Sequence, residues 1–324
     1  MPEQIVTADR MQGIKDKRGK FDFRTIFPFL GLLFVLILFG IMTKGSLFSK
    51  LNLKAVLNDG IYVMIGTVGF LFLFAQGALD FSVGANMATS CAVAAIAANS
   101  IGPGAALPAA LLTGTAIGII NGLVYTKLRI SAFITTLSGM FILQGLVLVI
   151  LDGSVLAAPI SMLKWFTNPL KLTILMAVLI IGYIMFQYTP YGKICKSIGS
   201  CPEAVRQTGI NLDFYRAIPF VTMGLLVGML AFLSLIRTGS ATNNTGGTLM
   251  FNVLNAALLG GLPMSGGPTT KFRGAIVGSL TIAFLVSGMT IMGIETTDQQ
   301  IVKGIVFLIA IGISFDRKNM KIIK

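Results

Sequence analysis

Histidine is absent from the sequence, cysteine occurs three times, and charged residues make up only 11% of the chain. The absence of histidine excludes catalytic triads built on an imidazole and leaves none to complete a zinc site. The cysteines, Cys91, Cys195 and Cys201, lack the spacing of a metal site, so we expect free thiols. No metal, cofactor or catalytic chemistry is therefore expected. A soluble domain carries about 25% charged residues, and the low charge argues against that class.

Long hydrophobic segments dominate the rest of the sequence. Hydrophobic residues form 55% of the chain, and the mean hydropathy is +0.86. A transmembrane helix needs about 20 mostly apolar residues. We therefore predict an all-α polytopic membrane protein with about ten transmembrane helices in one membrane domain. The segments are 26–42, 55–79, 85–101, 105–125, 131–151, 170–186, 215–236, 249–262, 274–293 and 299–315. The eighth is short, as expected of a buried or re-entrant segment.

Basic residues predict the orientation, because cytoplasmic loops carry an excess of Lys and Arg. An even number of spans places both ends on one side, and both ends are basic. We expect cytoplasmic tails over 1–25 and 316–324 on either side of a transmembrane domain over 26–315. The basic residues of the tails are Arg10, Lys15, Lys17, Arg18, Lys20, Arg24, Arg317, Lys318, Lys321 and Lys324. The same parity places inside Lys127, Arg129, Lys193, Lys196, Arg206, Arg216, Lys271 and Arg273.

Three further features bear on this topology. The first outer loop, with Lys44, Lys50 and Lys54, fits the charge rule less well. Residues 1–25 contain no apolar stretch of a signal peptide, so we expect them to stay attached. The net charge of +13 is explained by basic residues beside apolar spans, and we expect a lipid membrane rather than nucleic acid as the partner.

Glycines repeat every four positions in three segments. Such spacing lets helices in lipid approach closely. We therefore assign these glycines to packing within one subunit rather than to a solute. They are Gly114, Gly118 and Gly122, then Gly224 with Gly228, and Gly274 with Gly278.

Polar residues within the spans suggest a path for a solute. We expect Asp59 to be wetted by solvent near the outer end of its span. Asp80 lies between two apolar segments, where it either caps the following helix or lines the path. Most neutral polar residues in the spans are expected to bond across helices, but as a set they favour a neutral polar solute such as a sugar. The candidate path residues are Asp80, Ser82, Asn86, Thr136, Asn252 and Asn255.

A cytoplasmic segment over 192–213 carries a short helix signal. Ser200 and Glu203 have capping-box spacing, Pro202 suits a first turn, and Gly209 suits a helix end. A helix over about 200–209 is too short to span and marginal alone in water, so we expect it to dock against a partner. The candidate coupling residues are Ser200, Pro202, Glu203, Ala204, Arg206 and Gly209.

Four motifs resemble the permease subunit of ATP-binding-cassette importers of the ribose and monosaccharide type. GALDFSVG at 77–84 resembles the family's glycine, Ile-Asp-Leu-Ser-Val-Gly segment, and ISAFITTL at 130–137 resembles its Pro-Ser-Phe-Ile-Val-Thr-Leu run. YGK, SIG, PEA and TGI, spread over 191–210, resemble the loop that docks on the ATP-binding subunit. LGG and SGG within 259–267 resemble the late Gly-Gly, Ser-x-Ser-Gly-Gly signature.

The resemblance implies a pair of permeases in the bacterial inner membrane, identical or different, served by ATP-binding cassette subunits and an extracytoplasmic sugar-binding protein. Alternating access would follow, with the 200–209 helix transmitting motion. Lys193 lacks the flanking residues of a phosphate-binding loop, so ATP is expected to bind elsewhere.

The chain also departs from this family. The family commonly has Glu-Leu-Asp where this chain has Met250-Phe251-Asn252, and two further stretches, Pro263-Met264 and 268–271, are atypical. These departures leave open which solute is carried. Two alternatives stay open: a permease for branched-chain amino acids or nucleosides, and an ion-coupled secondary transporter using Asp80. A third alternative, a scaffolding membrane protein, ranks last because it gives the cytoplasmic helix no role.

Overall fold

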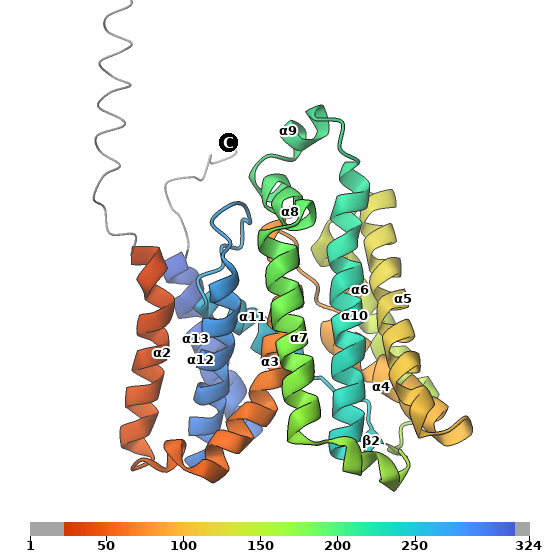
Figure 1. Ribbon diagram of the computed structural model, residues 1–324, viewed down its shortest axis with the longest axis vertical. Helices are drawn as coiled ribbons and strands as arrows, with labels where there is room; N and C mark the ends of the chain where they lie inside the picture. The colour runs from red at the N-terminus through yellow and green to blue at the C-terminus, as the bar shows by residue number, and fades with distance from the viewer. Residues whose placement is uncertain (1–22, 315–324) are drawn as a thin grey trace, which may run out of the picture.

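The computed structural model describes residues 23–314, with side chains over 26–312, and the two predicted tails lie almost wholly outside this range. Figure 1 shows a bundle of helices with nearly parallel axes. The helices are α2 (Phe23–Met42), α3 (Lys50–Ala75), α4 (Val83–Ser100), α5 (Ala106–Lys127), α6 (Ala132–Leu151), α7 (Asn168–Gln187), α8 (Pro190–Ser200), α9 (Pro202–Gln207), α10 (Leu212–Thr238), α11 (Leu249–Leu259), α12 (Phe272–Ile291) and α13 (Thr296–Ser314).

Short elements complete the chain. Three 3-10 turns are η1 (Ser46–Phe48), η2 (Pro103–Ala105) and η3 (Ile160–Trp165). The strands β1 (Leu156–Ala157) and β2 (Ser240–Ala241) pair antiparallel, with Leu156 opposite Ala241. This small sheet lies at the end of the bundle opposite to α8 and α9 (Figure 1).

Each of the ten predicted segments overlaps one helix, and the fold class, an all-α membrane protein, is confirmed. Within the described residues, six helices are long and apolar enough to cross a bilayer: α3, η2 with α5, α6, α7, α10 and α12. The helix of the eighth segment, α11, has 11 residues. At 1.5 Å per residue it is only about 16 Å long, so it crosses about half of the ~30 Å hydrocarbon layer.

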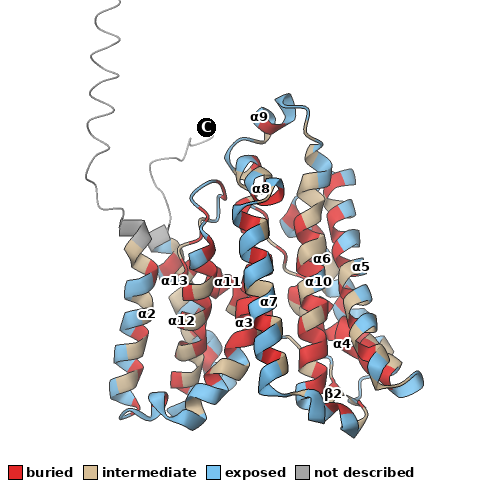
Figure 2. Ribbon diagram, viewed as in Figure 1, coloured by how far each residue is buried: buried red, intermediate tan, exposed pale blue. Residues whose placement is uncertain are grey.

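Burial separates central from peripheral helices (Figure 2). The apolar residues of α3 and α10 are mostly buried, whereas α6 and α7 expose most of theirs. Phe141, Ile142 and Val149 on α6, and Ile180 on α7, are exposed large hydrophobic side chains. A surface of this kind is expected where helices meet lipid tails.

The repeated glycines lie where helices touch. A Cβ atom at Gly114 would lie 2.5 Å from the main-chain oxygen of Gly224 and 2.9 Å from the Cα of Gly228, so α5 and α10 meet backbone to backbone. Gly118 meets the Phe220 backbone, and Gly122 meets Ala217. In the same way Gly274 and Gly278 on α12 face the α11 backbone at Gly260 and Ala256. Close approach of this kind replaces the hydrophobic drive that is missing in lipid.

Two non-helical segments, 76–82 and 260–271, interrupt the bundle next to each other. The amide of Gly267 donates to the main-chain oxygen of Ala75 at 2.9 Å and so satisfies the last turn of α3. Asp80, Ser82, Gly266 and Gly267 are buried, whereas Gly77 and much of 263–271 are exposed, so the protein covers these two segments only in part.

Candidate functional site

The cytoplasmic segment forms two helices, and the predicted capping box is wrong. Ser200 is the last residue of α8, and its hydroxyl donates to the Lys196 main-chain oxygen at 3.2 Å. The N-cap of α9 is Cys201, which makes no side-chain capping bond. The extended backbone of Cys201 separates the two helices, so Ser200 cannot reach the amide at position 203. The predicted end is confirmed: α9 stops at Gln207, and Gly209 has φ +79°.

The exposed side of α9 carries charge. Glu203 and Arg206 face solvent as a loose pair 4.0 Å apart, while Val205 is buried beneath them. Ala204 is also exposed, and Pro202 is half-buried in the first turn. Beside α9 lies a cavity of about 720 Å³, lined among others by Arg129, Glu203, Arg206, Asp213 and Arg216. This end of the molecule therefore presents a projecting helix next to a charged recess.

Helix α8 is held firmly on its inner side. The ring of Tyr191 stacks on Phe72 of α3 with centroids 4.8 Å apart, and its hydroxyl lies 3.1 Å from the Thr222 hydroxyl of α10. The Gln76 amide donates to the Tyr215 main-chain oxygen at 2.6 Å and lies 3.2 Å from the Cys195 sulfur. Burial raises the pKa of the Cys195 thiol to about 12.

Helix α8 also reaches both non-helical segments. Gly199 packs directly on the Ala75 main-chain oxygen and the Gly267 amide, with no room for a Cβ atom. Gly266, with φ +74°, lies against the backbone of Gly77. A displacement of α8 therefore acts on the 76–82 and 260–271 segments without an intervening side chain.

Four of the six candidate path residues are buried near the start of α4, where the Asp80 network, made of Asp80, Ser82 and Asn121, joins two of them. Asp80 accepts from the Ser82 amide at 2.9 Å and from the Ser82 hydroxyl at 2.6 Å. The Asn121 side chain of α5 donates to the same hydroxyl at 2.8 Å. Asn86 donates to the Gly114 main-chain oxygen at 3.3 Å, and Thr136 of α6 accepts from the Phe81 amide at 3.1 Å. The N-cap of α4 is Ser82, so Asp80 secures that cap from two residues upstream.

A second polar region is a cavity of about 360 Å³ at the opposite end of the bundle from α9. Its polar lining includes Asp59, Tyr62, Arg237, Thr248 and Asn252, and its apolar lining includes Val63, Met87 and Ile282. This volume lies within the roughly 300–1,000 Å³ of small-molecule sites, which combine apolar walls with a few polar groups. Asn252 is thus separated from the Asp80 network, and Asn255 lies one turn farther along α11, buried.

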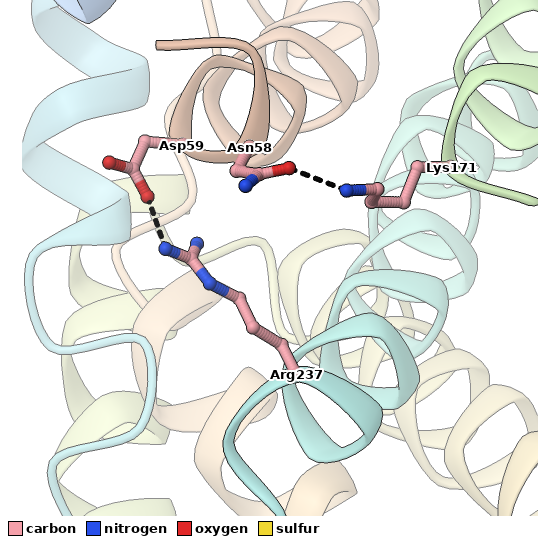
Figure 3. Close-up of polar contacts among 4 residues, drawn as sticks. All are labelled: Asn58, Asp59, Lys171 and Arg237. Carbon is pink, nitrogen blue, oxygen red and sulfur yellow. Dashed lines mark hydrogen bonds and ion pairs between the residues drawn. The ribbon is translucent and has the colours of Figure 1, made fainter. Parts of the chain in front are cut away.

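Two residues that line this cavity form an ion pair (Figure 3). Arg237 of α10 reaches Asp59 of α3 at 2.7 Å, and its guanidinium lies 5.5 Å from the centre of the Tyr62 ring. On the other side of α3, Lys171 of α7 donates to the Asn58 side-chain oxygen at 2.6 Å. Asp59 is exposed, as predicted from its place near the end of the span.

Sequence reasoning missed several of these groups. Lys303 of α13 donates to the Asn252 side-chain oxygen at 3.1 Å and lies within the predicted segment 299–315. An intramembrane lysine is a functional candidate by default, and this rule could have found it. Arg237 is another of the missed groups, because its partner Asp59 is far away in the sequence.

The bundle of apolar helices, the cavity beside Asp59 and Arg237 and the buried polar network are features of a membrane transport protein. The chain belongs to the family described as the branched-chain amino acid transport system / permease component, whose model matches residues 52–311.

Curated relatives cover most of the chain. It is 30% identical to the ribose import permease protein RbsC of Bacillus subtilis strain 168, over 98% of both chains. It is 29% identical to RbsC of Escherichia coli strain K12, over 86% of this chain and 91% of the relative. The L-arabinose transport system permease protein AraH of Escherichia coli strain K12 is 30% identical over 78% of each. No solved structure matches the chain at a significant level.

Proposed function

We propose that the chain is the permease subunit of an ATP-driven importer in the bacterial inner membrane, and that it carries a monosaccharide. The observation that carries this proposal is the α8–α9 segment, which exposes a charged helix outward and is fixed to the bundle inward. The relatives named as ribose and arabinose permeases support a sugar as the solute. The neutral polar residues of the path agree with this, since a sugar offers uncharged donors and acceptors.

The proposed topology has ten spans with both ends in the cytoplasm. The first described turn of α2 and the last turn of α13 lie at the same end of the bundle as α9 (Figure 1), which supports this orientation. The outer cavity then faces the extracytoplasmic side, where a sugar-binding protein delivers the solute. Residues 1–25 and 316–324 are the proposed cytoplasmic tails of a transmembrane domain over 26–315.

Coupling runs through α9, which docks on the ATP-binding cassette subunit by Glu203, Ala204 and Arg206, with Pro202 and Gly209 fixing its ends. Ser200 belongs to the transmitting helix α8. Motion of the docked helix displaces α8, and Gly199 passes the displacement to the 76–82 and 260–271 segments. Alternating access follows from this movement, with a second permease subunit completing the transporter.

The path leads from the outer cavity past Asn252 toward Asn255 on the same helix. The side-chain oxygen of Asn255 is buried without a hydrogen-bond partner among the described residues. An unpaired buried oxygen is costly. In the proposed cycle it gains a partner when the solute or water passes.

The first test is uptake of labelled pentoses, hexoses, nucleosides and branched-chain amino acids in cells with and without the permease, its binding protein and ATPase present. Permease-dependent accumulation of a sugar supports the proposal. Accumulation of amino acids or nucleosides alone would assign a different solute, and uptake that persists after ATP depletion would indicate a secondary transporter.

The second test addresses docking. Glu203→Lys reverses the charge on α9 and is expected to abolish co-purification of the ATPase subunit and sugar uptake, with membrane insertion intact. Glu295→Lys makes the same change on an exposed residue at the opposite end and is expected to retain the ATPase subunit. Equal retention in both variants would refute the docking role of α9.

A further inference from the structure

Lys303 is a buried charge that the proposed transport cycle does not yet use. On α13 the buried side chains Gln299, Lys303 and Ala310 follow one face, at spacings of four and seven residues. Ile301, Ile305 and Leu308 are exposed on the other side of the helix. Lys303 therefore points into the protein rather than toward lipid.

The ammonium of Lys303 meets an amide instead of a carboxylate. Helices α11 and α12, which pack against α13, contain no Asp or Glu. The hydrogen bond described for the ammonium goes to the side-chain oxygen of Asn252 at 3.1 Å. A charged side chain inside a membrane costs several kcal/mol unless it is paired or solvated. A neutral side chain in place of Lys303 would link α13 to α11 at a lower cost, so the charge needs another explanation.

The contact fixes which way the Asn252 amide faces. An ammonium has three N–H donors and no acceptor, so the carboxamide must turn its oxygen toward Lys303. Its nitrogen is then the amide atom that Lys303 does not contact. Asn252 is half-buried and also lines the outer cavity. The cavity wall therefore offers N–H donors at this position.

We infer that Lys303 is a positioning residue, which holds Asn252 so that its Nδ2–H groups bind an acceptor oxygen of the solute in the outer cavity. The inference rests on the proposed function, because it takes the solute to be a sugar. A hydroxyl or ring oxygen of the sugar is the acceptor. Asn252 thus selects for an oxygen at one position of the ring.

The decisive variant is Asn252→Asp, which keeps the shape, removes both donors and gives Lys303 a carboxylate partner. The probes are labelled D-ribose, D-galactose and L-arabinose, supplied to cells containing the complete importer. For the sugar that the wild type accumulates, the variant is expected to raise the KM of uptake about tenfold, as expected for one lost hydrogen bond. Its thermal unfolding midpoint should equal or exceed that of the wild type. Asn168→Asp, the same change on an exposed residue outside the cavity, should keep the wild-type KM.

A second readout separates positioning from structure. In the wild type, one monodeoxy analogue of the transported sugar should compete about tenfold less well than the sugar itself. In Asn252→Asp and in Lys303→Met this difference should disappear, because neither variant presents a fixed donor. Wild-type KM and wild-type analogue discrimination in both variants would overturn the inference, and so would loss of stability alone. A wild type that accumulates none of the labelled pentoses and hexoses would instead refute the proposed function.

Discussion

The ring of Tyr191 stacks on Phe72 with centroids 4.8 Å apart and planes 10° apart, and this contact joins α8 to the central helix α3. Stacked aromatic pairs contribute about 0.5–1.5 kcal/mol beyond the area they bury. The cytoplasmic segment is therefore fastened to the bundle by a packed contact rather than by a flexible loop.

Loss of this stack should weaken coupling. Tyr191→Leu is expected to lower the free energy of unfolding by about 1–3 kcal/mol and to reduce the sugar transported per ATP hydrolysed. Tyr191→Phe keeps the stack and loses only the contact with Thr222, so it should cost about 1 kcal/mol and leave the transport ratio unchanged. Thermal unfolding and uptake coupled to phosphate release measure both quantities. Equal transport ratios in the two variants would contradict the role of the stack.

The cysteines provide a test of orientation without any added label site. Cys201 is exposed between α8 and α9, whereas Cys91 and Cys195 are buried. Burial also raises the pKa of the Cys195 thiol to about 12, so that near pH 7.5 it is protonated and unreactive. A membrane-impermeant maleimide should therefore label one site, in inside-out vesicles and not in intact cells. Cys201→Ser should abolish the signal. Labelling of Cys201 in intact cells would contradict the proposed orientation.

Much of the helix arrangement could be predicted from the sequence, because a long apolar run is a local property. The positions of the long helices and the short length of α11 could be predicted from the lengths of the apolar segments. The partners of Asp80 could not be predicted, since Asn121 and Thr136 come from other helices. Ser200 was misassigned because capping-box spacing is local and common, whereas the actual boundary depends on the extended backbone at Cys201.

The glycines of α5 should be intolerant of even one added methyl group. A Cβ atom at Gly118 would overlap the Phe220 backbone of α10, so Gly118→Ala is expected to destabilise the protein by about 1–3 kcal/mol through overpacking. Gly145 lies in helix α6 with open space around its Cα, and Gly145→Ala should be neutral or stabilise by up to about 1 kcal/mol. Thermal unfolding of the purified permease compares them, and similar shifts would show that α5 and α10 can separate at little cost.

Substitutions at Ser82 should decide whether the Asp80 network caps a helix or lines the path. Ser82→Ala removes the hydroxyl that joins Asp80 to Asn121, leaving two buried polar groups without this partner. Each such group costs about 1–3 kcal/mol, so a structural network predicts a large loss of stability. Ser82→Thr keeps the hydroxyl and is the matched control.

Stability and transport must be measured on the same variants, because the two roles predict different combinations. If the network secures the start of α4, Ser82→Ala unfolds at a lower temperature, and the protein that remains folded transports with the wild-type KM. If Asp80 contacts the solute, Asp80→Asn raises the KM while the unfolding temperature changes little, since its side-chain oxygen still accepts from Ser82. We expect the first combination, because Asp80 is only 2% exposed and both bonds from Ser82 converge on one oxygen.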